Sequence, residues 1–262
     1  MDTAGTGGDG ANTINITTAA SLLAAAGGVK MIKHGNRSVS SKSGSADVLE
    51  ALNIPLDLDP DRAVRQFESA NFTFLFAPAY NPAIAFVQPV RKALGVTTLF
   101  NTMGPLLSPA KPEFQIMGIA NPGLGPIIAE TLKTLGRTRA LVVHGAGTDE
   151  IAVHGDTLVW ELRDGEISHY TVSPADLGAD TYTLEDLRGG DAAHNAAAMR
   201  ATFAGEGPAA HRDAIAVNAG AMFYLYGMAD SLAAGTEHAK ALLADGTVSR
   251  WLHTHEEADY SG

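Results

Sequence analysis

A glycine-rich segment near the start of the chain has the composition of a phosphate-binding loop. Residues 5–10 read Gly-Thr-Gly-Gly-Asp-Gly, followed by hydroxyl and amide side chains at Thr13, Asn15, Thr17 and Thr18. Glycine allows sharp turns that bring several N–H groups to one anion, and a helix starting after the loop adds the positive end of its dipole. The segment predicts a phosphate cradle of neither the Walker nor the Rossmann pattern. The alternative is a glycine-rich turn without a ligand. Asp9 argues against a turn without a ligand. A carboxylate beside phosphate is unfavourable unless a metal, a ribose hydroxyl or an amine offsets its charge, so its presence in the loop points to such a group.

A second loop, residues 33–45, combines cations with hydroxyl groups. It contains Lys33, Arg37 and Lys42 together with five serines. Arginine makes planar bidentate contacts to phosphate and lysine supplies a point charge, so this composition suits a polyphosphate. The alternative is a solvated surface loop. Ser45 is predicted to cap the helix that follows, with Asp47 in its first turn.

Two adjacent carboxylates, Asp149 and Glu150, follow a predicted buried strand at residues 139–144. Mg²⁺ usually takes one or two carboxylates together with substrate phosphates and waters, so the pair suits this cation. An isolated Asp-Glu pair is more often a solvated acidic turn, but beside two phosphate loops the metal site is the preferred interpretation.

A second possible metal pair, His253 and His255, lies among acidic residues on a predicted exposed terminal helix, and we interpret these histidines as surface residues.

The elements that must position these groups alternate between strands and helices. Short apolar runs rich in β-branched residues predict strands at 29–33, 72–76, 115–119 and 139–144. Segments rich in Ala and Leu predict helices at 17–26, 45–52, 123–135 and 191–203. This alternation predicts an α/β fold with a mainly parallel central sheet flanked by helices. Residues 157–162 and 167–172 are predicted to form a hairpin at an antiparallel edge, and the chain beyond residue 191 to be mostly helical.

Composition excludes several classes of function. The chain has 262 residues, is 45% hydrophobic and contains no cysteine, so neither a disulfide framework nor thiolate chemistry is available. Its formal net charge is −11, which disfavours nonspecific nucleic-acid binding. No stretch approaches the length of a membrane span, and the sequence shows no signal peptide. We therefore expect a cytoplasmic protein without nucleic-acid or membrane partners.

Several segments, in order, resemble the signature motifs of the anthranilate phosphoribosyltransferases. The resemblance covers nearly the whole chain and weakens after about residue 190. The segments are the two loops at 5–18 and 33–45, Phe74-Leu75-Phe76-Ala77-Pro78, Pro89-Val90-Arg91, Leu99-Phe100-Asn101-Thr102-Met103-Gly104-Pro105-Leu106 and His144-Gly145-Ala146-Gly147-Thr148-Asp149-Glu150.

The resemblance implies transfer of a phosphoribosyl group from phosphoribosyl pyrophosphate to the amine of anthranilate, releasing pyrophosphate, with Mg²⁺. This is the second step of tryptophan biosynthesis. Residues matching the family's phosphoribosyl pyrophosphate site are Gly5, Gly8, Asp9, Thr13, Asn15, Thr18, Lys33, His34, Asn36, Arg37, Ser41 and Ser45. Those implied to contact anthranilate are Gly5, Asn36 and Arg91, and those implied to hold Mg²⁺ are Thr17, Asp149 and Glu150. Thr17 replaces the family's usual serine but keeps the hydroxyl, so we expect it to remain a ligand.

The chemistry assigns catalytic roles to only a few of these residues. Cleaving the bond from ribose C1 to pyrophosphate builds negative charge on the leaving group, which the cation and three basic residues, Lys33, Arg37 and Lys42, would stabilise. Asp9, inside the cradle, is a candidate catalytic residue together with Lys33 and Arg37. The aromatic amine already carries a lone pair, so no general base is assigned. His34 is interpreted either as a chemical participant or as a packed, hydrogen-bonding residue.

Three alternatives remain open at this point. A pyrimidine nucleoside phosphorylase would share the fold and the glycine-rich loop. A relative that has become a nucleic-acid-binding protein is a second alternative, and an inactive fragment of the transferase is the third. The run Lys33-His34-Gly35-Asn36-Arg37 and the pair Asp149-Glu150 favour the transferase.

The start of the chain leads to a further expectation. Only Asp2, Thr3 and Ala4 are available for the strand that should precede the glycine-rich loop. The family's leading helices, which form a small helical domain and the homodimer contact, have no counterpart in this sequence. Residues 1–262 are therefore expected to form the α/β domain, with 78–103 as the remaining part of the helical domain. We expect such a chain to be less stable and less active than a version with those helices, and not to form the family's dimer.

Overall fold

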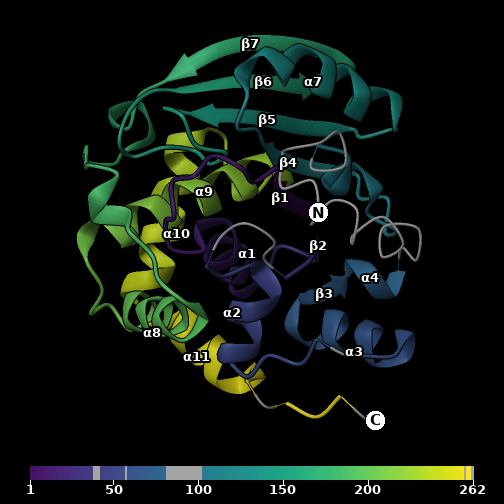
Figure 1. Ribbon diagram of the computed structural model, residues 1–262, viewed down its shortest axis with the longest axis vertical. Helices are drawn as coiled ribbons and strands as arrows, with labels where there is room; N and C mark the ends of the chain where they lie inside the picture. Colours follow the sequence, from purple (N-terminus) through teal and green to yellow (C-terminus); the bar gives the residue numbers. More distant parts are fainter. Residues whose placement is uncertain (38–41, 57, 81–101, 257, 261–262) are drawn as a thin grey trace.

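The computed structural model describes residues 1–37, 42–56, 58–80, 102–256 and 258–260 (Figure 1). The strands are β1 (Asp2–Gly5), β2 (Met31–Gly35), β3 (Phe72–Phe76), β4 (Phe114–Gly118), β5 (Arg139–Gly145), β6 (Thr157–Arg163) and β7 (Glu166–Val172). The helices are α1 (Ile16–Ala26), α2 (Ser45–Ala51), α3 (Pro60–Ala70), α4 (Ala77–Tyr80), α7 (Gly125–Thr134), α8 (Ala192–Phe203), α9 (Ala209–Tyr226), α10 (Leu232–Ala244) and α11 (Thr247–His255). Short 3-10 turns include η1 (Gly104–Leu107) and η4 (Glu185–Leu187).

The main sheet has the strand order β1-β4-β5-β6-β7. Strands β1, β4 and β5 run parallel, whereas β6 and β7 are antiparallel additions. The pairing register places Gly5 opposite Gly118, so β1 and β4 end at the same level. Loops leaving the carboxyl ends of these parallel strands therefore emerge along one edge, where α/β proteins usually bind ligands.

A second, two-stranded parallel sheet, β2-β3, adjoins β1. The N–H of Ile32 donates a hydrogen bond to the carbonyl of Met1 at 2.8 Å, and the N–H of His34 donates to the carboxylate of Asp2 at 3.3 Å. Because β2 runs beside β1, the basic loop after β2 begins next to the glycine-rich loop after β1.

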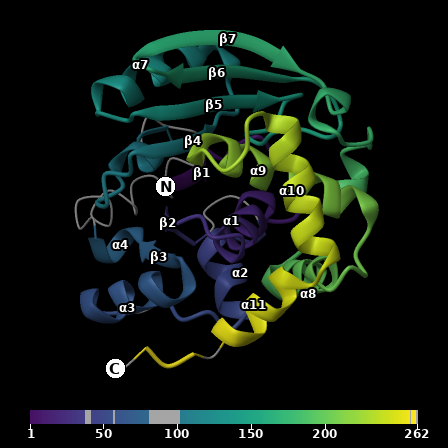
Figure 2. The same ribbon diagram turned by 180° about the vertical axis from the view of Figure 1, so that it is seen from behind.

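Helices cover both faces of the main sheet, as Figures 1 and 2 show. On one face, Ile128 and Leu132 of α7 pack on Val142, Trp160 and Leu162. On the other face lies the larger core, which includes α1, α9 and the inner residues of β4 and β5. Residues of α1 from Ala19 to Ala25 are fully buried, which explains why this helix is apolar on nearly every side. Figure 2 shows α10 alongside α9, closing the helical layer.

The predicted α/β fold with its mainly parallel sheet is confirmed. The predicted strands and helices are present within two residues at each end. The hairpin turns at Asp164 and Gly165, whose φ values of 53° and 78° fit a two-residue turn of the type that matches strand twist. Sequence reasoning overlooked α3, although Asp59 caps it and Pro60 occupies its first turn, which is a readable start signal.

One local prediction was wrong. Ser45 is the first helical residue of α2 and not its cap; the N-cap position belongs to Gly44. The carboxylate of Asp47, in the first turn as predicted, accepts a hydrogen bond from the N–H of Gly44 at 2.8 Å. Because Asp47 caps this end of the helix, the hydroxyl of Ser45 does not have to, and it accepts a hydrogen bond from Thr18 instead.

Most of the segment 78–103, predicted as part of a helical domain, lies outside the described residues, so that assignment stays a prediction.

Candidate active site

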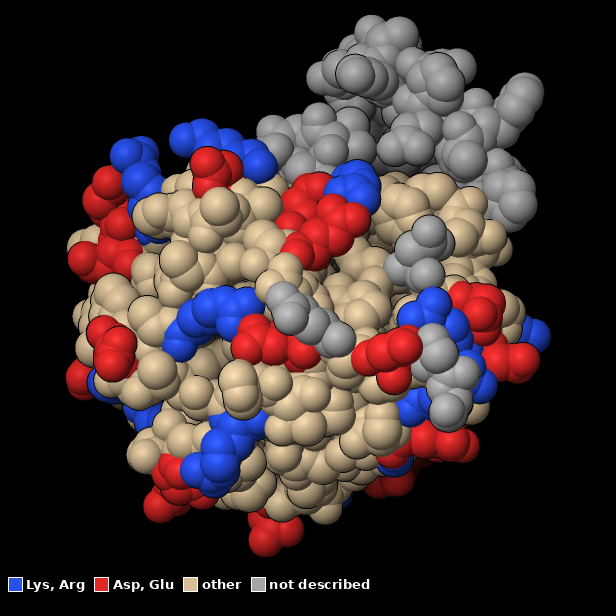
Figure 3. All heavy atoms as spheres, turned by 90° about the horizontal axis from the view of Figure 1, so that it is seen from below, with Lys and Arg blue, Asp and Glu red and all other residues tan. Residues whose placement is uncertain are grey.

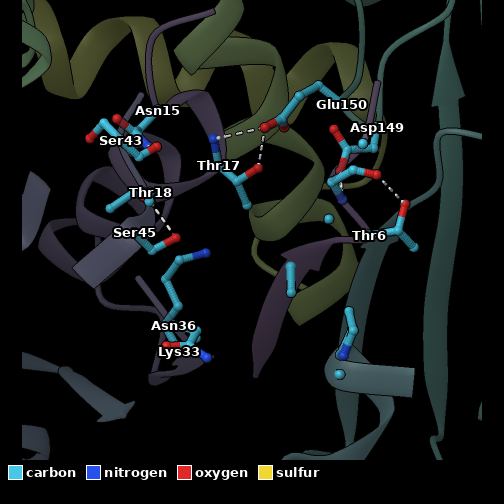
Figure 4. A pocket seen from close by; sticks show the side chains of 18 of the residues that line it. Thr6, Asn15, Thr17, Thr18, Lys33, Asn36, Ser43, Ser45, Asp149 and Glu150 are labelled. Atoms are coloured by element: carbon cyan, nitrogen blue, oxygen red, sulfur yellow. Dashed lines mark hydrogen bonds between the residues drawn. The ribbon is translucent and has the colours of Figure 1, made fainter. Parts of the chain in front are cut away.

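A cavity of about 360 Å³ opens at the carboxyl edge of β1, β2 and β5. Its walls come from the glycine-rich loop, the start of α1, the loop between β2 and α2, the turn η1 and the acidic pair after β5. Segments distant in sequence therefore meet at one place, and Figure 4 shows their side chains around it.

Every residue that the sequence assigned to a site lines this cavity, with two exceptions: Ser41 and Arg91 lie outside the described residues. The structure brings the following assigned residues together: Gly5, Gly8, Asp9, Thr13, Asn15, Thr17, Thr18, Lys33, His34, Asn36, Arg37, Ser45, Asp149 and Glu150. Lys42, a third cation of the basic loop, is exposed and does not line the cavity.

The glycine-rich loop takes a backbone path that side chains rarely allow. Gly7, Gly8 and Gly10 have φ values of 65°, 84° and 72°. The N–H of Gly7 donates to Oδ2 of Asp149 at 2.6 Å, and the carboxylate of Asp9 accepts from the N–H of Ala11 at 3.1 Å. The loop is therefore fastened both to itself and to the acidic pair.

Glu150 is directed at the start of α1. Its Oε1 accepts a hydrogen bond from the hydroxyl of Thr17 and a second from the backbone N–H of Thr17 at 3.3 Å (Figure 4). Burial, followed by the negative charge of Asp149, raises the pKa of Glu150 to about 8. Burial and the charge of Asp9 likewise raise the pKa of Asp149 to about 6. The two carboxylates are thus held in a setting that disfavours two negative charges without a cation.

The acidic pair approaches the sheet closely because glycines leave room for it. A Cβ on Gly5 would lie 2.1 Å from Oδ2 of Asp149, and a Cβ on Gly118 would lie 1.7 Å from its carbonyl oxygen. From the other side, the Asn218 amide accepts from the N–H of Ile151 at 3.0 Å and donates to its carbonyl at 2.9 Å. This asparagine fixes the backbone immediately after Glu150.

Lys33 is a buried basic residue in the wall of the cavity. Its side chain is 2% exposed, and Nζ donates to the carbonyl of Thr3 at 2.9 Å. Burial lowers the pKa of Lys33, while the negative charges of Asp2 and Glu150 act in the opposite direction. Burial also lowers the pKa of neighbouring His34, and its Nε2 has no hydrogen-bond partner within the described part of the chain.

Arg37 reaches the cavity but is paired with acidic residues of α2. Its guanidinium donates to the two carboxylate oxygens of Glu50 at 2.6 and 2.5 Å and to Asp47 at 3.2 Å. These hydrogen bonds raise the pKa of Arg37, so the group carries its charge at all ordinary pH values. Three of the five guanidinium N–H donors serve this pairing, and the acidic residues hold the group toward α2.

Hydroxyl and amide groups join the segment that follows the glycine-rich loop to the basic loop. The hydroxyl of Thr18 donates to Ser45 Oγ at 3.1 Å (Figure 4), and the amide of Asn15 donates to the carbonyl of Ser43 at 3.1 Å. Although Asn15 is the N-cap residue of α1, its side chain makes no capping bond to the first turn, which faces the cavity. In place of a capping bond from Asn15, the first turn has Glu150, whose carboxylate accepts from the N–H of Thr17.

The residues present fit a divalent cation that takes some of its ligands from the protein and the others from a bound substrate and water. Asp149, Glu150 and Thr17 supply hard oxygens at one wall, and burial of the two carboxylates opposes their ionisation without a compensating cation. Within the described ranges, no group of three or more His, Cys, Asp or Glu side chains is placed to hold a metal by itself. A bound Mg²⁺ would thus need further oxygens from phosphate and water, as this ion usually does.

Sequence reasoning missed three supporting residues: Gly118, Asn195 and Asn218. Asn195 is 2% exposed on α8, and its amide donates to Oδ1 of Asn15 at 2.8 Å. Both asparagines interrupt Ala-rich helices, where asparagine is a weak helix former, and this is the signal that could have identified them. Gly118 has no comparable signal.

The face of the molecule seen in Figure 3 carries no continuous basic patch. Lys and Arg side chains alternate there with Asp and Glu, in keeping with the net charge of −11. Among the described helices, none has the length and apolar character needed to cross a bilayer.

Comparison with known proteins identifies the family. Residues 1–249 match the family described as "Glycosyl transferase family, a/b domain". The chain is 74% identical over 260 residues to anthranilate phosphoribosyltransferase of Corynebacterium aurimucosum, covering 99% of this chain and 75% of that protein. It is 71% identical to the enzyme of the same name from Corynebacterium diphtheriae, covering 100% of this chain and 76% of the relative.

Solved structures agree. Anthranilate phosphoribosyltransferase from Thermus thermophilus superposes with a TM-score of 0.90 at 43% identity, covering 97% of this chain and 76% of that one. The enzyme from Saccharomyces cerevisiae, solved in complex with PRPP and Mg, superposes with a TM-score of 0.88 at 27% identity, covering 98% and 72%. These matches favour the transferase over the phosphorylase. The chain belongs to the anthranilate phosphoribosyltransferase family.

Proposed function

We propose that this cavity transfers the 5-phosphoribosyl group from phosphoribosyl pyrophosphate to the amine of anthranilate and releases pyrophosphate. The observation that carries the proposal is the meeting of three features around one cavity: the glycine-rich loop before α1, the basic loop after β2, and the acidic pair Asp149-Glu150. Each feature suits one part of a metal-bound diphosphate ester. The reaction itself is inferred from membership of the anthranilate phosphoribosyltransferase family.

Phosphoribosyl pyrophosphate is proposed to lie between the two loops. The residues assigned to it are Gly5, Gly8, Asp9, Thr13, Asn15, Thr18, Lys33, His34, Asn36, Arg37, Ser41 and Ser45. Anthranilate is assigned to Gly5, Asn36 and Arg91, with the guanidinium of Arg91 pairing the carboxylate. Placement around one cavity supports these assignments for every residue that the structure describes.

The chain's own groups promote departure of pyrophosphate. As the bond from ribose C1 breaks, negative charge grows on the leaving oxygen, and Lys33, Arg37 and the N–H groups of the glycine-rich loop stabilise it. Asp9, within the same loop, offsets positive charge developing on the ribose. The amine attacks with its lone pair, so the site has to position it and needs no strong base.

Thr17, Asp149 and Glu150 would hold Mg²⁺ against the pyrophosphate. When bound, the cation neutralises phosphate charge and compensates the two buried carboxylates. The family's homodimer and a cytoplasmic location belong to the same proposal, and sedimentation and cell fractionation test them.

The test follows consumption of anthranilate by its fluorescence in the presence of phosphoribosyl pyrophosphate and Mg²⁺. Arg37→Ala should raise KM for phosphoribosyl pyrophosphate, and Arg91→Ala should raise KM for anthranilate, each about tenfold to hundredfold, because each loses a charge-assisted hydrogen bond. Thymidine phosphorolysis without anthranilate transfer would overturn the proposal. An unchanged KM for anthranilate in Arg91→Ala would overturn that residue's assignment.

A further inference from the structure

We propose that Asn195 on α8 is a positioning residue for phosphoribosyl pyrophosphate, acting by fixing the orientation of the Asn15 amide. The inference rests on the proposed function. Asn195 does not line the cavity, whereas Asn15 does. The contact between them links the C-terminal helical layer to the phosphate loop.

A directed chain of hydrogen bonds determines which way both amides face. The backbone N–H of Gly190 donates to Oδ1 of Asn195 at 2.8 Å, and a backbone N–H can only donate. Nδ2 of Asn195 must then face the other way, where it donates to Oδ1 of Asn15 at 2.8 Å.

The far end of the chain specifies the same orientation. Nδ2 of Asn15 donates to the backbone carbonyl of Ser43 at 3.1 Å, and a carbonyl can only accept. An amide nitrogen carries two hydrogens, so one N–H of Asn15 remains for the cavity. Reversing the Asn15 amide would place its oxygen against the Ser43 carbonyl and direct an acceptor at the phosphate oxygens.

Asn15 also occupies a position where its side chain would normally have another role. It is the N-cap residue of α1, and asparagine at this position usually accepts a backbone N–H of the first turn. Here no side-chain capping bond forms, because Oδ1 is directed to Asn195 instead. The contact therefore leaves the first-turn N–H of Thr17 to Glu150 and keeps an N–H donor of Asn15 beside the start of the helix.

The backbone around the contact is held too. The N–H of Ile14 donates to the carbonyl of Leu187 at 3.0 Å, and the N–H of Gly189 donates to the carbonyl of Asn12 at 2.8 Å. A Cβ on Gly189 would lie 2.4 Å from the Thr13 carbonyl, so the two segments are in close contact. Because Asn195 is 2% exposed, water does not compete for its amide, which strengthens the orientation.

The first test replaces Asn195 in two ways. Asn195→Asp keeps the shape and the acceptor for Gly190 but cannot donate to Asn15, and Asn195→Ala removes the amide without adding charge. Both should raise the Kd for phosphoribosyl pyrophosphate with Mg²⁺ about tenfold by calorimetry, as expected for a misdirected hydrogen bond to a charged group. KM for anthranilate and kcat at saturating phosphoribosyl pyrophosphate should change less than about twofold. Equal losses for both substrates would indicate a structural role only and overturn the proposal.

A double-mutant cycle shows whether Asn195 acts through Asn15. In an Asn15→Ala background, Asn195→Ala should weaken phosphoribosyl pyrophosphate binding no further, because the amide it orients is gone. Additive effects would contradict the proposal. Met199→Ala is the matched control: Met199 lies one turn further along α8 and is 2% exposed, so it disturbs helix packing without touching Asn15.

A readout without substrate separates this inference from the proposed function. The side-chain ¹⁵NH₂ signals of Asn15, assigned with an Asn15→Ala sample, should shift in Asn195→Asp and Asn195→Ala and stay in place in Met199→Ala. If the unsubstituted protein bound no phosphoribosyl pyrophosphate but these signals moved, the proposed function would fail and the orienting contact would stand. Unmoved signals would overturn the contact itself.

Discussion

Gly118 and Asp149 pass so closely that no other residue fits at position 118. A Cβ there would lie 1.7 Å from the carbonyl oxygen of Asp149, which is backbone and cannot rotate away. At Gly5 the obstructing atom is the Asp149 carboxylate, 2.1 Å from the added Cβ, and a side chain can move. Gly118 thus makes room for the backbone of Asp149, and Gly5 makes room for its side chain.

Alanine substitutions at these glycines should separate stability from metal binding. Gly118→Ala has to displace the loop that carries Asp149, so we expect a loss of about 1–3 kcal/mol in the free energy of unfolding together with weaker Mg²⁺-dependent substrate binding. Gly5→Ala should retain most of the stability and lose metal-dependent binding, because only the carboxylate moves. Chemical denaturation and calorimetry measure the two effects. Equal stability of Gly118→Ala and the unsubstituted protein would contradict the close approach.

The acidic pair should matter for substrate binding through the cation. Asp149→Asn combined with Glu150→Gln keeps the shapes of both side chains and removes both charges. We expect phosphoribosyl pyrophosphate to bind about tenfold or more weakly in Mg²⁺, while the difference should shrink in EDTA. Calorimetry with and without the metal checks this. A folded double variant that retains full affinity in Mg²⁺ would disprove the metal site.

The same pair should make stability depend on pH in the absence of metal. The folded protein holds the pKa values of Asp149 and Glu150 at about 6 and about 8, above their ordinary values of 3.8 and 4.5. As pH rises from about 5 to about 8, the unfolded chain releases these protons before the folded one does, so stability should fall. The proposed Mg²⁺ site requires ionised carboxylates, so the stabilising effect of added Mg²⁺ should grow over the same range. Unfolding midpoints measured across this range decide it, and the control is the double variant that combines Asp149→Asn with Glu150→Gln, which should flatten both trends.

Glu50 should compete with phosphate for Arg37. Glu50→Gln removes the charge that holds the guanidinium on α2, and because the pair is about half exposed, at 49% and 47%, its strength is modest. We expect phosphoribosyl pyrophosphate to bind up to about fivefold more tightly. Glu185→Gln, which removes the exposed partner of Arg188, is the control and should leave affinity unchanged. Weaker binding in Glu50→Gln would show that the pair positions Arg37 for the substrate.

Local sequence was sufficient for most of the elements and for the chemistry of the loops. Backbone freedom and charge are properties of the residues themselves, so they can be read from the sequence. The examples are the glycines at 5–10, the cations and serines at 33–45 and the adjacent carboxylates at 149–150. The hairpin at Asp164 and Gly165 was predictable for the same reason, since its turn residues need positive φ.

The relative placement of these groups, and the contacts that hold them there, come from long-range packing. The need for glycine at 118 comes from the backbone of Asp149 on a different loop, the role of Asn195 from a contact with Asn15 that spans 180 residues, and the pairing of Arg37 with Glu50 from the placement of α2. The raised pKa values of Asp149 and Glu150 likewise arise from burial, which depends on what packs around a residue. Residue type determines which interactions a side chain can make, but the packing of distant segments determines which of them it does make.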